Sequence, residues 1–364
     1  MQITNCHTHT FTHDHVPDHF APYLVGLLLQ VRWIRRALLF IMRHLDLERH
    51  GKFTRYAHIL QVSYDCGSQE GVFKLVRSYF PRDTRFVVLP MDMELMNAGK
   101  VKESIGLQHA QLGELRDKYP ELVIPFAAAD ARHDDVVENT KRLIEENGFR
   151  GIKLYPPIGY HPNDAALRPL YDYAVEHGIP VMTHCSRPAS VQYRGEPTEQ
   201  MRIDPETGGR LSLGREELLT LYTDPDAYVP ILDARPTLTI CLAHFGGAGD
   251  WEGFLDDPWD AGSAAGKQSW LAKIMDMIKS GKYENLYTDI SYTVFANEEY
   301  VYLLKVLLSD EKVRRRVLFG SDFYVVENAE LEERRRAVRM RAVLGEDLFQ
   351  TIAHDNPRSY LGEA

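Results

Sequence analysis

The sequence predicts a single (β/α)8 barrel, and three observations support this fold class. Past residue 80, short apolar or β-branched runs alternate with longer segments of helical periodicity. Alternating strands and helices imply parallel strands joined by right-handed crossovers, and eight such units in 364 residues fit a barrel better than an open sheet. No Gly-x-Gly-x-x-Gly turn follows the first strand, so a doubly wound dinucleotide-binding sheet, the main alternative, lacks its strongest signal.

Eight strands are expected, in order along the chain. The first covers residues 2–6 and leads directly into His7-Thr8-His9. The other seven are short runs rich in apolar and β-branched residues, namely Arg85–Met91, Leu122–Ala129, Gly151–Tyr155, Pro180–Cys185, Leu238–Ala243, Leu286–Ile290 and Val317–Gly320.

Helical periodicity fills several of the intervening segments, most clearly Val136–Glu146, Leu167–His177, Ala272–Ser280, Tyr300–Leu308 and Leu331–Val343. Gly148, Gly178 and Gly281 follow three of these helices, where a left-handed C-cap is expected. Two long insertions, at about residues 10–80 after the first strand and 187–236 after the fifth, interrupt one domain that spans residues 1–364. Because loops after barrel strands form the catalytic face, both insertions should wall the site.

Composition is ordinary for a soluble globular protein, with 44% hydrophobic and 26% charged residues. The formal net charge of −10 argues against nucleic acid as a partner, since phosphate binding needs a basic surface. Met1 leads straight into a strand, which leaves no room for a signal peptide, and four scattered cysteines without a Cys-x-x-Cys motif argue against disulfides. We therefore expect a cytoplasmic protein.

Residues 23–45 form a very apolar segment that Arg32, Arg35, Arg36 and Arg43 interrupt. Arginine at mid-bilayer costs a few kcal/mol, so no transmembrane segment is expected. Offsets of about three, four and seven residues gather the arginines on one face of a helix. The broad apolar face is expected to pack on the barrel or on a second subunit, with covering the site or lying on a membrane surface as alternatives. We predict a homodimer.

Polar side chains end most of the strands. His7 and His9 lie two residues apart and point the same way, where they could bind a divalent metal, although ordinary surface histidines explain this pair alone equally well. His13-Asp14-His15 follows no apolar strand and is expected to be a surface loop over the site. Later strands end with Lys153, His184, Arg187, His244, Asp289, Ser291 and Asp322. A metal would supply the partner that so many buried polar groups need.

The cysteines near these histidines are expected to be core residues. Cys6, Cys185 and Cys241 each lie at an odd offset from a neighbouring rim histidine. Because side chains alternate along a strand, these offsets predict thiols that face the helices. The metal ligands would then be nitrogen and oxygen only, a set that suits zinc first, with manganese, iron or cobalt possible.

The chain resembles the amidohydrolase superfamily, specifically the branch called amidohydrolase 2, which includes aminocarboxymuconate-semialdehyde decarboxylase and related resorcylate decarboxylases. The resemblance covers nearly the whole chain and rests on motifs in a fixed order: His7-x-His9, Gly151-Ile-Lys153-Leu, Thr183-His184, Leu242-Ala-His244-Phe-Gly-Gly, Gly320-Ser-Asp322 and Asn356-Pro-Arg-Ser-Tyr-Leu-Gly. It implies that one divalent metal would be held by His7, His9, His184 and Asp322, and that His244 would face the substrate.

The roles such groups can take suggest a mechanism. Asp322 can act as general base toward metal-activated water, and His244 can polarise a carbonyl or stabilise the developing oxyanion. Lys153 and Arg187 are cationic candidates for binding a substrate carboxylate. The alternatives are a salt bridge to a rim carboxylate for Lys153 and a solvated loop charge for Arg187.

Two activities share this set of residues. The first expectation is a metal-dependent hydrolase of a small carboxylated amide, ester or lactone, and the second is a non-oxidative decarboxylase of an aromatic or muconate-type acid. A non-catalytic membrane-associated barrel is a third reading, which the intact metal set opposes. Similarity to phosphotriesterase-like enzymes also leaves open a binuclear site bridged by a carboxylated Lys153.

Overall fold

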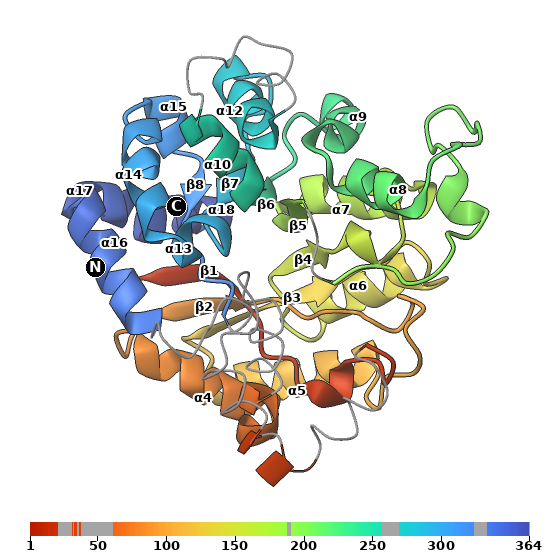
Figure 1. Cartoon of the computed structure of the whole chain (residues 1–364), viewed down its shortest axis with the longest axis horizontal. Coiled ribbons are helices and arrows are strands. Elements are labelled where there is room, and N and C mark those ends of the chain that lie inside the picture. Colours follow the sequence, from red (N-terminus) through yellow and green to blue (C-terminus); the bar gives the residue numbers. More distant parts are fainter. Residues whose placement is uncertain are drawn as a thin grey trace.

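The computed structural model describes residues 1–20, 31, 33–34, 36–37, 61–187, 191–256, 269–323 and 333–363. The predicted barrel is confirmed, since eight parallel strands pair in chain order (Figure 1). They are β1 Thr4–Thr8, β2 Arg85–Val88, β3 Val123–Ala128, β4 Gly151–Leu154, β5 Val181–Ser186, β6 Ile240–Gly246, β7 Leu286–Asp289 and β8 Val317–Leu318. Each lies within two or three residues of its expected position.

Backbone hydrogen bonds join the end of the sheet at β8 to its beginning at β1. The amide of Asp322 donates to the carbonyl of His7 at 2.8 Å, and the amide of His9 donates to the carbonyl of Phe323 at 2.7 Å. These bonds close the ring of strands. They also bring the residues that follow β8 against the histidines of β1.

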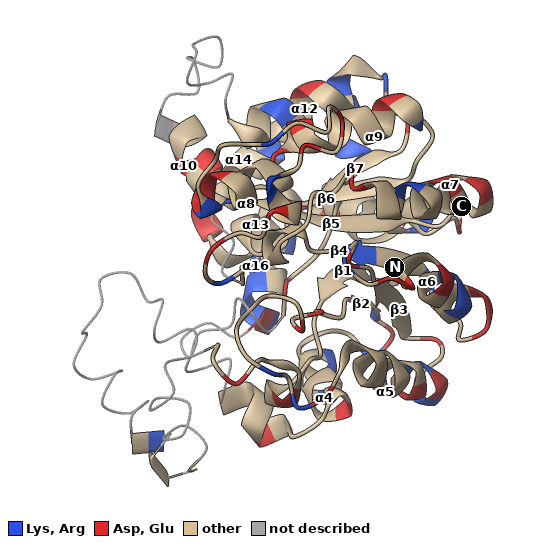
Figure 2. Ribbon diagram, turned by 90° about the vertical axis from the view of Figure 1, so that its right-hand side faces the viewer, with Lys and Arg blue, Asp and Glu red and all other residues tan. Residues whose placement is uncertain are grey.

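Helices surround the strands, and the ribbon colours place Lys, Arg, Asp and Glu residues mainly on the helices and the connecting loops (Figure 2). The five expected helices are present as α6 Val136–Glu145, α7 Arg168–His177, α12 Trp270–Ser280, α14 Glu298–Leu307 and α16 Glu333–Leu344. Gly148, Gly178 and Gly281 have φ angles of 64°, 64° and 68°, as the left-handed C-caps require. The sequence did not single out α5 Ile105–Lys118, α10 Ala248–Asp256, α13 Thr293–Ala296, α15 Glu311–Arg314 and α17 Glu346–Gln350. The last helix, α18 Asn356–Tyr360, coincides with the Asn356-Pro-Arg-Ser-Tyr-Leu-Gly motif.

The described parts of both insertions contain helices. The first insertion holds α4 Gln69–Tyr79, and the second holds α8 Arg215–Thr223 and α9 Val229–Ala234. The helix expected over 23–45 falls almost wholly outside the described residues. Among the helices that are described, none combines the length and the apolar character that a membrane crossing needs.

Buried side chains of the strands alternate between two cores. One core packs against the helices, and the other fills the barrel. The interior core consists of Cys6, Val87, Leu89, Ile124, Phe126, Met182, Cys241, Ala243, Tyr287 and Leu318, with Tyr360 and Leu361 from the end of the chain. Gly151 makes room for Phe126, since a Cβ on this glycine would lie 2.4 Å from the phenyl ring.

The predicted orientation of the cysteines is wrong for two of the three. Only Cys185 packs in the helix-facing core, whereas Cys6 and Cys241 belong to the interior core. The reason is a shift in register within β1 and another within β6, where one extra residue enters the strand. A bulge inverts the alternation of side chains beyond it. The interior therefore holds both these thiols and the neighbouring histidines.

Candidate metal centre

Titratable side chains from five strands meet where the strands end. None of them is more than 7% exposed, and they are His7 and His9 of β1, His184 of β5, His244 of β6, Asp289 of β7 and Asp322 after β8. The sequence placed these residues on one rim, and the structure brings them together at the carboxyl-terminal mouth of the barrel. In (β/α)8 enzymes this mouth is the catalytic end.

Three of these side chains share a compact arrangement of ligand atoms. Nε2 of His7 lies 3.5 Å and Nε2 of His9 lies 3.1 Å from Oδ1 of Asp322. One ligand atom from each of the three lies within 4.8 Å of the others. Asp322 has a left-handed φ of 61°, a conformation that is uncommon outside glycine and that the closing bond to His7 helps to hold.

The second nitrogen of each β1 histidine already has a partner. Nδ1 of His7 donates to Oδ2 of Asp289 at 2.8 Å, and Nδ1 of His9 donates to the carbonyl of Leu89 at 2.7 Å. Carbonyl and carboxylate oxygens only accept, so the proton sits on Nδ1 and the lone pair on Nε2 faces the centre. Metal-ligating histidines typically have such a partner on the outer nitrogen.

The environment of His7 fits a divalent cation. Its Nε2 is buried and makes no hydrogen bond to any described residue. Burial, together with the nearby positive charge of Lys153, lowers the pKa of His7 to about 3, so the imidazole is neutral at pH 7. A buried lone pair without a hydrogen-bond donor is costly unless a ligand completes it, and a metal ion would do so.

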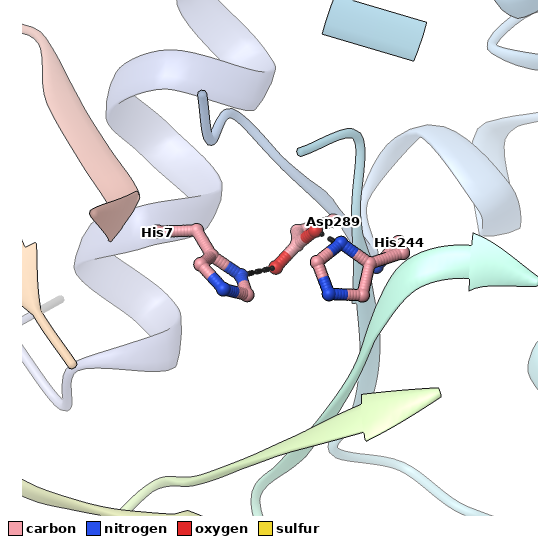
Figure 3. A group of neighbouring side chains, drawn as sticks. All are labelled: His7, His244 and Asp289. Carbon is pink, nitrogen blue, oxygen red and sulfur yellow. Dashed lines mark hydrogen bonds and ion pairs between the residues drawn. The ribbon is translucent and has the colours of Figure 1, made fainter. Parts of the chain in front are cut away.

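Asp289 forms a second grouping with His7 and His244 (Figure 3). Its Oδ1 accepts from the backbone amides of His244 and Ser291, each at 3.0 Å. Burial alone would raise the pKa of Asp289, but the electrostatic interaction with His7 and the hydrogen bond from its Nδ1 outweigh this effect and hold the pKa below its usual range. Since its oxygens are already engaged, Asp289 fits an orienting role, and His7, His9 and Asp322 form the better cation site.

His184 and His244 contact each other. Nδ1 of His184 lies 3.0 Å from Nε2 of His244, and Nε2 of His184 lies 3.1 Å from Oγ of Ser186. Burial lowers the pKa of both histidines. Within the described residues, neither compact ligand grouping includes His184, so its place as a metal ligand stays a prediction.

The competing run of histidines does not join the centre. His13, Asp14 and His15 form a short 3-10 helix, and His15 is only 1% exposed, so the expected surface loop is wrong for this residue. Nδ1 of His15 accepts from the amide of Thr12 at 2.9 Å, which leaves its Nε2 as a donor, 3.2 Å from Glu103. A protonated nitrogen offers no lone pair to a metal.

Lys153 lies deep in the barrel. The residue is 2% exposed, and its Nζ makes no hydrogen bond within the described part of the chain. Burial lowers its pKa to about 8, although Asp289 and Asp322 favour the charged form. The alternative reading, a salt bridge to a rim carboxylate, is therefore not observed among the described residues. The amine is close enough to Asp289 and Asp322 for both carboxylates to influence its pKa.

Arg187 is engaged at the rim. Its Nε and Nη2 lie 3.2 and 3.0 Å from the carboxylate of Asp250, and its guanidinium stacks on Trp270 at 4.7 Å. It is therefore more than a solvated loop charge. Binding of a substrate by Arg187 stays a prediction, and it would compete with this ion pair.

Sequence reasoning gave no role to Asp289 and Ser291, although it noted both at the end of strand seven. The structure shows that they contact His7 and His244. An Asp-x-Ser motif directly after a buried strand was the available signal. Its meaning depends on which strands lie beside it.

A buried cluster of histidines and carboxylates at the mouth of a (β/α)8 barrel defines the class of site as a candidate metal centre. The chain belongs to the amidohydrolase family, whose model matches residues 73–362. This confirms the resemblance that the sequence motifs indicated. No curated protein sequence matches the chain.

Several solved structures share the fold. A 5-carboxyvanillate decarboxylase from Novosphingobium aromaticivorans, complexed with manganese and 4-hydroxy-3-methoxy-5-nitrobenzoic acid, is 16% identical with a TM-score of 0.57, over 99% of this chain and 96% of that one. A 2,6-dihydroxybenzoate decarboxylase is 15% identical with a TM-score of 0.55, over the whole of both chains. The 4-oxalomesaconate hydratase of Rhodopseudomonas palustris is 15% identical with a TM-score of 0.53, over 100% of this chain and 96% of that one.

Proposed function

We propose that this protein is a divalent-metal-dependent decarboxylase of a small aromatic acid. The observation that carries the metal dependence is the buried, unpartnered Nε2 of His7 beside His9 and Asp322. The choice of decarboxylation is supported by the names of the similar structures, two of which are decarboxylases of substituted benzoates. The hydrolase expected first from the sequence is therefore the second candidate.

His7, His9 and Asp322 would hold the metal, with His184 as the fourth ligand that the sequence motifs imply. Zinc suits this ligand set, and manganese is the ion named in one similar structure. When bound, the metal supplies a Lewis acid that polarises a substrate oxygen.

Aromatic rings border the histidines. The ring of Tyr155 lies 4.6 Å from that of His184, the ring of Phe11 meets His9 edge-on at 5.6 Å, and that of Tyr292 lies 6.2 Å from His244. Such walls favour a flat substrate, since aromatic rings pack well in stacked and edge-to-face contacts. The amine of Lys153 would attract the negative charge of the acid.

Decarboxylation breaks the bond between the ring carbon and the carboxylate, releases carbon dioxide and returns a proton to that carbon. Asp322 and His244 are the titratable groups at the centre that would carry this proton. In a hydrolase the same two residues would serve water addition, with Asp322 as base. The description of the matching family, amidohydrolase, supports this second candidate.

A paired screen separates the two activities. Protein purified without chelator and loaded with manganese or zinc is offered hydroxybenzoates and muconate-type acids, and released carbon dioxide is measured. A parallel panel offers carboxylated amides, esters and lactones, and acid production is followed. Carbon dioxide release that depends on the metal supports the proposal, whereas turnover confined to the second panel establishes the hydrolase.

A further inference from the structure

Asp289 is a common anchor for two histidines that lie far apart in the sequence. Besides Nδ1 of His7, it accepts the hydroxyl of Ser291 on Oδ1 at 2.5 Å and the backbone amide of His244 at 3.0 Å. Asp289 and Ser291 are both 0% exposed, so water does not compete for these bonds. The carboxylate thus organises one side of the centre.

The hydroxyl of Ser291 has a single proton, and the short contact with Oδ1 of Asp289 shows that this proton is donated to the carboxylate in a hydrogen bond. Oγ can then only accept from the imidazoles, and it lies 3.1 Å from Nδ1 of His7 and 3.0 Å from Nδ1 of His244. The carbonyl of Ser291, which also only accepts, lies 3.2 Å from Nδ1 of His244. His244 therefore carries its proton on Nδ1 and a lone pair on Nε2.

The lone pair of His244 in turn fixes His184. Nε2 of His244 lies 3.0 Å from Nδ1 of His184, so His184 must be the donor in this contact. The proton of His184 is then on Nδ1 and a lone pair is on Nε2, as in His7. The hydroxyl of Ser186 lies 3.1 Å from this Nε2 and can donate to it, so a metal would have to displace that hydrogen bond.

The backbone at the end of β6 holds His244 in the position that these contacts require. His244 and Phe245 have left-handed φ angles of 70° and 46°, and such conformations persist only where the surroundings hold them. A Cβ on Gly246 would lie 2.6 Å from the backbone nitrogen of Leu271, so the turn packs directly on α12. This turn aims both the amide and the ring of His244 at β7.

We propose that Ser291 and His244 are positioning residues that carry the orienting effect of Asp289 to His184. Asp289 orients His7 directly and orients His184 through these two links. One carboxylate thereby presets both imidazoles for a divalent metal. The inference rests on the metal centre of the proposed function but not on its substrate.

Manganese affinity of the full-length protein tests the relay, with free Mn²⁺ followed by electron paramagnetic resonance. The variants are Ser291→Ala, His244→Asn, the double variant and Thr288→Val. Asparagine can replace Nδ1 of the imidazole but does not reach the position of Nε2, so it breaks the contact with His184. Thr288 of β7, three residues before Ser291, is the matched control, because its equally buried hydroxyl donates to the carbonyl of Leu242, outside the centre.

Each single variant at 291 or 244 is expected to weaken Mn²⁺ binding about tenfold, as is typical for partners of metal ligands. The double variant should bind about as well as His244→Asn alone, since Ser291 acts on His184 through His244. Thr288→Val should stay within about threefold of the wild type.

Additive losses in the double variant, an unchanged Ser291→Ala protein, or an equal loss in Thr288→Val would overturn the relay. If the affinities follow the expected pattern but no substrate loses carbon dioxide, the decarboxylase fails and the relay stands. A wild-type protein without affinity for Mn²⁺ would overturn the metal centre and the relay together.

Discussion

At the residue scale, the partner of the outer nitrogen decides what each imidazole offers to the centre. His7 and His15 are both buried histidines of the N-terminal segment. Nδ1 of His7 donates to Asp289, so the lone pair of His7 is on Nε2. Nδ1 of His15 instead accepts from the amide of Thr12, so the proton of His15 is on Nε2. Burial alone therefore does not make a ligand, and the tautomer does.

The first prediction concerns metal content. The purified protein should carry about one divalent metal per chain, and His7→Ala, His184→Ala or Asp322→Ala should remove it or abolish activity, since a three-ligand remnant holds a metal poorly. Elemental analysis of protein purified without chelator provides the measurement, with His161→Asn as a histidine control outside the cluster.

Full occupancy together with full turnover in His184→Ala would contradict this ligand set. Two metals per chain with a carboxylated Lys153 would instead place the protein in the binuclear class.

His244 should be separable from the metal ligands. At saturating metal, His244→Asn is expected to keep one ion per chain and to lower turnover about a hundredfold or more, as expected on removing one electrostatic or acid–base contributor. Metal stoichiometry and kcat are measured on the same preparation. Stoichiometric loss of the ion would show that His244 is itself a ligand.

A pH-dependent contribution to stability is expected from His133, whose Nε2 lies 2.7 Å from Oδ2 of Asp92. This hydrogen bond raises the pKa of His133 to about 8, above its unfolded value. The stabilisation is therefore complete below about pH 6.5 and is lost as the pH rises through about 8. Partial exposure screens the pair, so about 1 kcal/mol is expected.

Urea denaturation of the wild type and His133→Gln at about pH 6 and pH 9 measures this contribution. The free energy of unfolding should fall more steeply with pH in the wild type. Identical pH dependence in the two proteins would assign the pair no role in stability.

At the element scale, small irregularities in the strands set the direction of the functional side chains. The bulges lie between Asn5 and Thr8 in β1 and between Ala243 and Gly246 in β6, so they let His7 and His244 share the barrel interior with Cys6 and Cys241. Sγ of Cys241 lies 3.9 Å from Oδ2 of Asp289. Gly320 after β8 has a similar effect, because a Cβ there would lie 2.8 Å from Cβ of His7. Only glycine lets the two strands approach this closely.

The C-terminal helix α18 should contribute measurably to stability through Tyr360, which is 1% exposed and whose hydroxyl donates to the carbonyl of Val181 at 2.9 Å. Tyr360→Phe should lower the free energy of unfolding by about 1–2 kcal/mol, because it leaves the buried carbonyl of Val181 without this donor. Tyr360→Ala should cost about 3–5 kcal/mol because it also opens a cavity.

Denaturant titration measures both changes, and Tyr302→Ala on the exposed face of α14 serves as the control. Tyr302 is 64% exposed, so its substitution should change the free energy of unfolding by no more than about 0.5 kcal/mol. Equal effects at the two tyrosines would contradict a role for α18 in the barrel interior.

At the scale of the whole molecule, closure of the barrel brings together residues from opposite ends of the chain. His7 and Asp289 are 282 positions apart, and Asn5 bonds to Ser321 across 316 positions. The centre therefore requires the complete ring of strands. No short continuous stretch of the sequence holds all the residues of the centre.

We also predict a homodimer, from the apolar segment over 23–45 that lies almost wholly outside the described residues. An apolar face of that extent is expected to be covered by a second subunit or to fold across the site. Size measurement in solution of the wild type and of Leu28→Glu and Leu39→Glu tests this directly. A wild-type monomer whose variants stay soluble and fully active would mean that the segment does neither.

The sequence by itself determined the barrel, the family and the rim, because strand–helix alternation and the order of histidines at strand ends are local patterns. Only the tertiary structure decided which nitrogen of His7 and of His9 faces the centre, and that Arg187 pairs with Asp250. It also decided that Asp289 and Ser291 contact His7 and His244. The physical reason is that tautomers and ion pairs depend on neighbours from other strands. Bulges then shift side chains away from the faces that simple alternation predicts.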